Sequence, residues 1–419
     1  MSRLDSLWAR TAPPGPDCAP LDGDTETETA IVGAGFTGLS AALRLSEQGV
    51  SCCVLEANEI GYGGSGRNVG LVNAGLWLPP DKIEAALGRE KGERLVSALS
   101  DAPAQVFALI DRHGIECEAT RTGTIHAAHS PAGQRELVER HAAWSALGAP
   151  VELLDRDGAA SAIGTRAFHG GLLDRRAGTI NPLGYARGLA HAAARADGRN
   201  AGARLFAGTP VSGVSPSGTG WVVETPRGRV RADRVLLATN AYGGGLGADA
   251  VYTPIHYFQV ASTPLGDAGA DIMPDRQGVW DTAPVMTSVR RDRAGRLIFG
   301  SMGRLAGRLS ERWADRAARR LFPALGKLEW ECAWHGRIAL TRDHLPRLLT
   351  PAPGLWAVMG YNGRGIGPGT VLGRWLADAA LGGEPPPVPV HEAGSDRLRP
   401  LRAAAFETAF RAWLTMKSI

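Results

Sequence analysis

A glycine-rich turn near the N-terminus is the feature that most constrains the fold. Residues 30–40 read AIVGAGFTGLS, and Gly33, Gly35 and Gly38 have the G-x-G-x-x-G spacing of a dinucleotide-binding βαβ unit. Gly33 permits a tight turn, Gly35 leaves room for a pyrophosphate, and Gly38 lets the helix pack closely on the strand. We therefore expect a strand before the turn and, after it, a helix N-terminus that offers free N–H groups to phosphate.

The segments on either side of the turn support this interpretation. A β-rich run at 27–32 precedes it, an alanine- and leucine-rich helix is expected over 35–48, and a second apolar strand at 51–55 ends in Glu56. That acid lies 18 residues beyond Gly38, near the distance expected for a carboxylate that binds a ribose. The alternative is an ordinary α/β turn with Glu56 as a solvated strand end, and the complete set of parts favours the dinucleotide site.

Composition narrows the class of protein further. The 419 residues provide room for two domains, and the balance of 46 basic against 42 acidic residues gives no argument for a nucleic-acid partner. The five cysteines lack metal-ligand spacing, so we expect no metal site, no disulfides and a cytoplasmic location. No apolar run is long enough to span a membrane, and the N-terminus lacks the apolar region of a signal peptide.

Local signals outline the rest of the chain. Four prolines predict an irregular arm over residues 1–26. The glycine-rich loop 61–70 either brings backbone donors and an arginine to a second part of a large cofactor or is a flexible surface loop. Asn181 followed by Pro182 marks a helix start, and the apolar run 235–238 predicts a buried parallel strand of the first sheet.

The C-terminal half has a different character. Strand-like, aromatic-rich stretches recur between residues 251 and 340, which predicts an antiparallel sheet in a second domain. A strand at 355–359 and a glycine-rich loop then precede a helix expected over 370–381. Apolar residues at helical spacing over 406–414 predict a helix docked on the body of the protein rather than on a membrane.

Several of these blocks together resemble the FAD-dependent D-amino-acid oxidase superfamily, over about residues 27–385. The blocks are the glycine turn, Glu56, the loop 61–70, and residues 235–242, 334–337, 341–346 and 354–376. The runs 61–70 and 360–367 are most similar to the γ-glutamylputrescine oxidase branch, beside glycine and sarcosine oxidases. The resemblance implies an α/β fold, with a Rossmann-like FAD-binding domain and an α+β substrate domain that contains a mixed or antiparallel sheet.

The resemblance also implies domains that are discontinuous in sequence. An N-terminal arm at 1–26 and a C-terminal connector and helix at 386–419 are expected to flank them. The FAD-binding segments would be 27–80, 150–245 and 345–385, and the substrate-binding segments would be 81–149 and 246–344.

The family pattern places FAD contacts residue by residue. The glycine turn would face the pyrophosphate, Glu56 the ribose, Val211 the adenine, and the C-terminal glycine loop the pyrimidine edge of the flavin. The full set of expected contacts is Gly33, Gly35, Phe36, Thr37, Gly38, Glu56, Ala57, Ser65, Gly66, Arg67, Asn68, Val211, Ala238, Thr239, Asn240, Gly363, Arg364, Gly365, Ile366 and Gly367.

The activity that the resemblance implies is oxidation of a small-molecule amine or amino acid. Hydride would pass from the substrate to flavin N5, the imine would hydrolyse, and oxygen or another acceptor would reoxidise the flavin. Arg337 is the expected carboxylate-binding residue, Tyr361 and Tyr257 are expected in an aromatic cage, and His256 would orient the amine, although each could instead be a packing or ion-pair residue. Further candidates are Tyr252, Trp280, Arg304 and Arg364.

Departures from the family pattern leave alternatives open. The stretch 297–302 lacks the lysine that assists reaction with oxygen in sarcosine-oxidase-type enzymes, so a dehydrogenase that reduces a quinone or a protein is a second interpretation. Cys332 and His335 lie near the position at which some relatives attach the flavin covalently, but a buried unmodified cysteine is the favoured interpretation. A flavin monooxygenase would need an NAD(P)H site, for which the sequence shows no second glycine fingerprint, and a non-catalytic FAD-binding subunit is the remaining alternative. The sequence does not set the oligomeric state.

Overall fold

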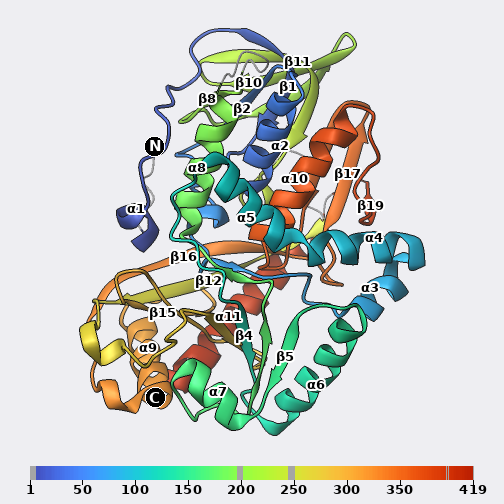
Figure 1. Cartoon of the computed structure of the whole chain (residues 1–419). Helices are drawn as coiled ribbons and strands as arrows, with labels where there is room; N and C mark the ends of the chain where they lie inside the picture. The colour runs from blue at the N-terminus through green and yellow to red at the C-terminus, as the bar shows by residue number, and fades with distance from the viewer. Residues whose placement is uncertain (1–5, 196–201, 244–250, 393, 395, 419) are drawn as a thin grey trace.

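The computed structural model describes residues 6–195, 202–243, 251–392, 394 and 396–418. In this part of the chain the strands form two large sheets, one in the upper and one in the lower half of Figure 1. A small third sheet pairs β3 (Leu71–Val72) with β7 (Gly178–Thr179). This architecture confirms the expected α/β fold with a Rossmann-like sheet and a separate mixed sheet.

The first sheet is built around β1 (Thr25–Val32), which pairs in parallel with β11 (Gly228–Leu237) and β2 (Cys52–Leu55). The last four residues of β1 are buried, as expected for a parallel strand covered on both faces. The run 235–238 lies in β11 up to Leu237, so the buried parallel strand is confirmed. The order is β19 (Val390–His391), β17 (Arg347–Ala352), β18 (Leu355–Met359), β11, β1, β2 and β8 (Arg204–Phe206), with β10 (Gly220–Thr225) antiparallel to β11 and β9 (Gly213–Ser217) antiparallel to β10.

Helix α2 (Phe36–Glu47) follows the glycine turn and packs against α8 (Pro182–Ala194) and α10 (Ile366–Ala380) (Figure 1). The Asn181 side chain accepts a hydrogen bond from Gly184 N at 3.1 Å, which confirms the expected N-cap of α8. Helix α10 begins four residues earlier than the predicted start at 370. Its glycines allow the close packing on α2, because a Cβ at Gly373 would lie 2.4 Å from Thr37 O.

The second sheet is mixed, and β13 with β4 is its parallel pair among the described strands. Its order is β16 (Trp330–Leu340), β12 (Thr253–Ser262), β15 (Leu297–Met302), β14 (Ser288–Arg291), β13 (Gly278–Asp281), β4 (Thr124–Ala127), β6 (Gly171–Asp174) and β5 (Val151–Leu154). The predicted domain boundary at residue 150 is therefore wrong, because β5 and β6 pair with the second sheet. The other domain boundaries remain predictions.

Helices differ from the sequence-based expectations at two places. The segment 81–112, whose sequence predicts a helix interrupted near Pro103, is three helices. One break falls at Asp101, close to that proline, and a further break falls at Gly88, which has a φ of +79°. The expected irregular arm contains a short helix, α1, whose Leu7 and Trp8 are fully buried. The helices not yet given bounds are α1 (Leu7–Thr11), α3 (Pro80–Leu87), α4 (Arg89–Ser100), α5 (Ala102–His113), α6 (Pro131–Ala146), α7 (Arg156–Ile163), α9 (Arg308–Leu321) and α11 (Arg399–Ser418).

Helix α11 lies against α9 and β12, so the expected docked C-terminal helix is confirmed (Figure 1). No described helix combines the length and the apolar character that crossing a membrane requires.

The contact between α2 and α10 predicts the effect of one substitution. Gly373→Ala should destabilise the protein by about 1–3 kcal/mol, because the new Cβ meets backbone rather than a flexible side chain. This loss would overcome the gain of up to ~1 kcal/mol in helix propensity. Gly213→Ala is the control, since its Cβ would meet only a side-chain oxygen at 3.6 Å. Equal midpoints for both variants in urea unfolding would contradict the close-packing argument.

Candidate active site

A cavity of about 730 Å³ lies between the carboxyl ends of the first sheet and one face of the second sheet. Its wall runs from the glycine turn past the loop 61–70 to the strands β12, β13 and β15, and it also includes the loop before α10. Clefts at the carboxyl ends of parallel strands are the usual ligand sites of such sheets. The cavity therefore joins the two predicted sites, one for a dinucleotide and one for a substrate.

The glycine turn forms one wall of the cavity. Gly33 has a φ of +103°, which favours glycine, and a Cβ at Gly35 would lie 2.8 Å from Ser65 Oγ. Gly33, Gly35, Phe36 and Thr37 line the cavity. Gly38 does not, because it faces the turn itself, where a Cβ would lie 2.0 Å from Gly33 O. Gly33 and Gly38 thus provide the tight turn and the close packing that were expected, whereas a Cβ at Gly35 would meet the Ser65 side chain.

Glu56 lies directly after β2 with both carboxylate oxygens held by backbone. Oε2 accepts from Ala34 N at 2.9 Å and Oε1 accepts from Asn58 N at 3.0 Å. Burial raises the pKa of Glu56, while the backbone hydrogen bonds oppose that change. Ala57, Val211 and the residues Ala238, Thr239 and Asn240 line the same end of the cavity.

The loop 61–70 meets the cavity through some of its residues only. Ser65 and Asn68 line it, and Ser65 Oγ accepts a hydrogen bond from Phe36 N at 3.0 Å. Gly66 and Arg67 do not line it. The Arg67 guanidinium instead donates to Tyr62 O at 2.8 Å and to His335 O at 3.3 Å, so its side chain ties the loop to β16.

The loop before α10 supplies Gly363, Arg364 and Gly365 to the wall, and the first residue of the helix supplies Ile366, whereas Gly367 packs toward α5. Arg364 is buried, and its Nη1 donates to Ala74 O at 2.9 Å. Its guanidinium carbon lies 4.8 Å from the Trp77 ring centre and 5.5 Å from that of Trp280.

Arg364 forms no ion pair among the described residues, although the negative charge of Asp174 opposes the lowering of its pKa. The Arg364 Nε has no hydrogen-bond partner. Burial, together with the positive charge of Arg140, lowers the pKa of Arg364 to about 9. A buried guanidinium with a free donor at a cavity wall is suited to hold an anion.

Three of the predicted catalytic residues line the cavity. Arg337 lies with its guanidinium carbon 4.5 Å from the Tyr242 ring centre. The Tyr361 hydroxyl is 2.7 Å from Thr37 Oγ1, so this buried tyrosine links α2 to the C-terminal loop. The Tyr257 hydroxyl lies over Gly336 without a partner, and burial raises its pKa well above the ordinary value.

The structure corrects the role expected for His256. This residue does not line the cavity; its Nδ1 lies 2.7 Å from Glu407 Oε1 of helix α11, and its backbone N donates to the same oxygen at 3.0 Å. His256 therefore fastens the C-terminal helix and has no geometric support as a residue that orients a substrate.

Sequence reasoning named Trp280 as a candidate but missed two polar residues that also line the cavity, His126 and Gln259. The His126 and Trp280 rings stack 4.9 Å apart at 19°, and Gln259 lies over Gly300. His126 Nδ1, Trp280 Nε1 and Gln259 Oε1 are buried without partners. Alternation along β4 and β12 was the only available signal, since the face that each strand presents depends on pairings between distant segments. Trp77, Arg140, Phe406 and Phe410 were also missed.

Neither candidate for covalent attachment lies at the cavity wall. Cys332 is buried in an apolar cluster with Leu7, Trp8 and Trp334, and His335 lies beside His256. The favoured interpretation of Cys332 as a buried structural residue agrees with this placement. Among the described residues no cluster of histidine, cysteine or acidic side chains is arranged to hold a metal ion.

Comparisons with known proteins agree with this geometry. A family model described as FAD dependent oxidoreductase matches residues 28–379. The chain is 30% identical over 384 residues to a probable oxidoreductase OrdL of Rhizobium meliloti (strain 1021), and the match covers 90% of this chain and 88% of that protein. It is 30% identical over 383 residues to the gamma-glutamylputrescine oxidoreductase of Escherichia coli (strain K12), and this match covers 87% of this chain and 86% of that protein.

A solved structure supports the fold. Glycine oxidase from Geobacillus kaustophilus superimposes with a TM-score of 0.70 at 23% identity, and the match covers 86% of this chain and 95% of that chain. The cavity also fits the cofactor that the family implies, because the glycine turn at the start of α2 lines it and Glu56 presents a carboxylate there that backbone N–H groups hold in place. The chain belongs to the FAD-dependent oxidoreductase family of the D-amino-acid oxidase type, and its cofactor is FAD.

Proposed function

We propose that the protein oxidises the carbon–nitrogen bond of an amine or amino acid that carries a carboxylate group. The observation that carries this proposal is Arg364, a buried guanidinium at the cavity wall with no carboxylate partner among the described residues. Burying an unpaired charge is costly, and a substrate carboxylate would offset that cost through charge-assisted hydrogen bonds. The relatives named glycine oxidase and gamma-glutamylputrescine oxidoreductase support this class of substrate.

The residues of the glycine turn and Glu56 would hold the pyrophosphate and ribose of the cofactor. FAD, when bound, supplies the redox chemistry by accepting a hydride from the substrate carbon that bears the nitrogen. Loss of the hydride and of one N–H proton converts the amine to an imine, which water hydrolyses to a carbonyl compound and ammonia or a smaller amine. No protein nucleophile is needed, so the protein's task is to bind, orient and exclude water.

The floor of the cavity can perform that task. Arg364 would fix the carboxylate, and the nearby rings of Trp77 and Trp280 would help to hold the guanidinium in place. The unpartnered Gln259 Oε1 and Tyr257 hydroxyl are available to accept hydrogen bonds from the substrate nitrogen. The surrounding aromatic side chains would keep the reacting carbon out of water.

For the electron acceptor we propose oxygen, with release of hydrogen peroxide. One observation favours a dehydrogenase as the second candidate: β15 (Leu297–Met302) contains no lysine. The speed with which air restores the oxidised flavin separates the two candidates.

Anaerobic titration with matched pairs of amines tests the substrate class. The panel contains glycine, sarcosine, D- and L-amino acids and γ-glutamyl amines. At least one of these compounds should bleach the flavin absorbance, whereas the matching amine without a carboxylate should not. Bleaching by the amines that lack a carboxylate as fast as by their carboxylated partners would contradict the role given to Arg364. Bleaching by NADPH alone would instead indicate a monooxygenase.

Replacing each cavity arginine tests which one binds the carboxylate. Arg364→Gln should raise the KM for the carboxylated substrate by about 10- to 100-fold, because one charge-assisted hydrogen-bond partner is lost. Arg337→Gln should change the KM far less, since Arg337 is only half-buried and its charge does not need a ligand to compensate it. The opposite ranking in steady-state kinetics would transfer the role to Arg337.

The Glu56 carboxyl predicts a pH dependence of FAD binding. Its ionised form accepts hydrogen bonds from ribose hydroxyls, and burial raises its pKa above the ordinary 4.5. FAD should therefore bind more weakly as the pH falls from 7 toward 5, and Glu56→Gln should bind weakly with little pH dependence. Glu28→Gln serves as the control, because Glu28 is an exposed residue of β1 that does not line the cavity. An unchanged pH profile in Glu56→Gln, measured by fluorescence titration, would remove Glu56 from the site.

A further inference from the structure

The glycine-rich loop 61–70 is called the cofactor loop here. Five successive carbonyl groups of this loop, those of residues 66–70, accept hydrogen bonds from side chains that are distant in sequence. Ser6 Oγ donates to Gly66 O at 3.4 Å, Trp334 Nε1 to Arg67 O at 2.8 Å, Trp8 Nε1 to Asn68 O at 2.8 Å, and Arg290 Nη1 to Val69 O at 3.1 Å and Gly70 O at 3.4 Å. We call Ser6, Trp8, Arg290 and Trp334 the carbonyl clamp.

The carbonyl clamp is one packed unit. The Trp8 and Trp334 rings meet edge to face at 5.9 Å, and the Arg290 guanidinium carbon lies 5.3 Å from the Trp8 ring centre. Trp8 is 0% exposed and Arg290 is 1% exposed. Arg290 Nη1 also donates to Ile180 O at 2.6 Å, so its charge is directed at carbonyl oxygens rather than at a carboxylate. Trp8 lies between the other two large side chains and joins them.

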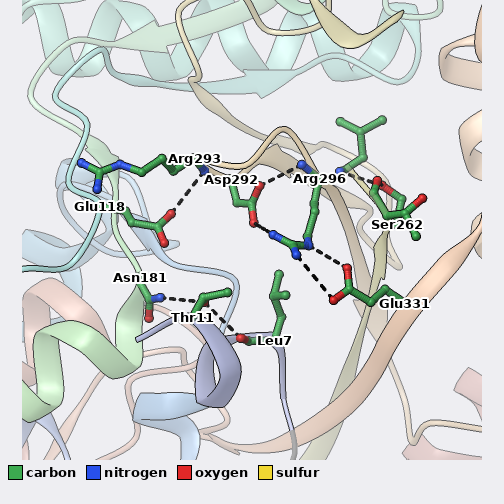
Figure 2. A network of polar contacts seen from close by, with 11 residues as sticks. Leu7, Thr11, Glu118, Asn181, Ser262, Asp292, Arg293, Arg296 and Glu331 are labelled. Carbon is green, nitrogen blue, oxygen red and sulfur yellow. Dashed lines mark hydrogen bonds and ion pairs between the residues drawn. The ribbon is translucent and has the colours of Figure 1, made fainter. Parts of the chain in front are cut away.

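The helix that carries Trp8 is held by the body of the protein. Thr11 Oγ1 donates to Leu7 O at 3.0 Å and accepts from Asn181 Nδ2 at 3.1 Å (Figure 2). The Ser6 side chain caps the helix by accepting from Ala9 N at 3.2 Å. A helix of five residues has little stability alone, so these tertiary contacts maintain it.

The opposite side of the same loop faces the cavity. Ser65, Asn68 and Val69 line it, and Asn68 Nδ2 donates to Gly64 O at 2.9 Å and Ser65 O at 3.0 Å. The loop contains several glycines, whose backbones lose the most conformational freedom on ordering. Contacts that order such a loop before a ligand arrives increase the affinity for that ligand.

We propose that helix α1 is part of the FAD site and that Trp8 is a positioning residue, which orders the loop 64–70 through the carbonyl clamp before the cofactor binds. Ser6 and Trp8 precede the stretch 28–379 that matches the family model. The N-terminal arm thus contributes to cofactor binding without touching the cavity. This inference concerns FAD alone and does not depend on the substrate proposed above.

Trp8→Phe tests the proposal, because it keeps an aromatic ring against Trp334 and Arg290 but removes the N–H that reaches Asn68 O. In deflavinated protein titrated with FAD, we expect the dissociation constant to rise about fivefold, the effect of one net hydrogen bond. In the apoprotein the amides of residues 64–70 should exchange hydrogen faster. Trp221→Phe is the matched control, since Trp221 is also buried and its Nε1 donates to Pro353 O at 3.3 Å, away from the loop. The control should leave both measurements unchanged.

A second variant protects the test against a folding defect. Trp334→Phe removes the donor to the neighbouring Arg67 O and should weaken FAD binding in the same direction. If both variants fold and bind FAD as tightly as the unmodified protein, with unchanged exchange in the loop, the proposal is wrong. A lower unfolding temperature without a change in FAD affinity or loop exchange would also overturn it, because it would make α1 a structural support only.

Discussion

The close backbone approach at the glycine turn is the constraint on which the rest of the site depends. A Cβ at Gly38 would lie 2.0 Å from Gly33 O, so only glycine lets α2 start directly against the turn. The first residues of α2 then fix two distant loops. Phe36 N donates to Ser65 Oγ, and Thr37 Oγ1 lies 2.7 Å from the Tyr361 hydroxyl. One turn thereby sets the position of both loops that border the cavity.

Signals that act over a few residues allowed the cofactor half of the site to be predicted. The glycine spacing, the acid at the end of β2 and the Asn181 cap each depend on neighbours in the chain, and the structure contains all three features. The placement of β6 beside β4, and of β5 beside β6, could not be predicted, because strand pairing between distant segments leaves no local pattern. Proline content likewise concealed the buried Trp8, whose partners lie more than 50 residues away.

Two buried arginines show why the type of a residue alone does not reveal its role. Arg290 directs one nitrogen at three carbonyl oxygens, and burial lowers its pKa to about 10. Arg364 has one carbonyl partner and two indole rings nearby, and it lines the cavity, which Arg290 does not. The Nε of each arginine has no hydrogen-bond partner. Three carbonyl dipoles compensate the first charge within the protein, whereas we propose that a ligand compensates the second. The distribution of acceptors around each guanidinium therefore separates a structural arginine from a binding one.

Both ends of the chain return to the site from outside the stretch that matches the family model. At one end Trp8 contacts the outer side of the cofactor loop, and at the other Phe406 and Phe410 of α11 line the cavity. Glu407 of the same helix accepts hydrogen bonds from His256 and from Arg304 N, which fixes α11 on β12 and on the turn after β15. The two terminal helices therefore act in different ways: α11 lines the cavity directly, whereas α1 contacts the cofactor loop from the side that faces away from it.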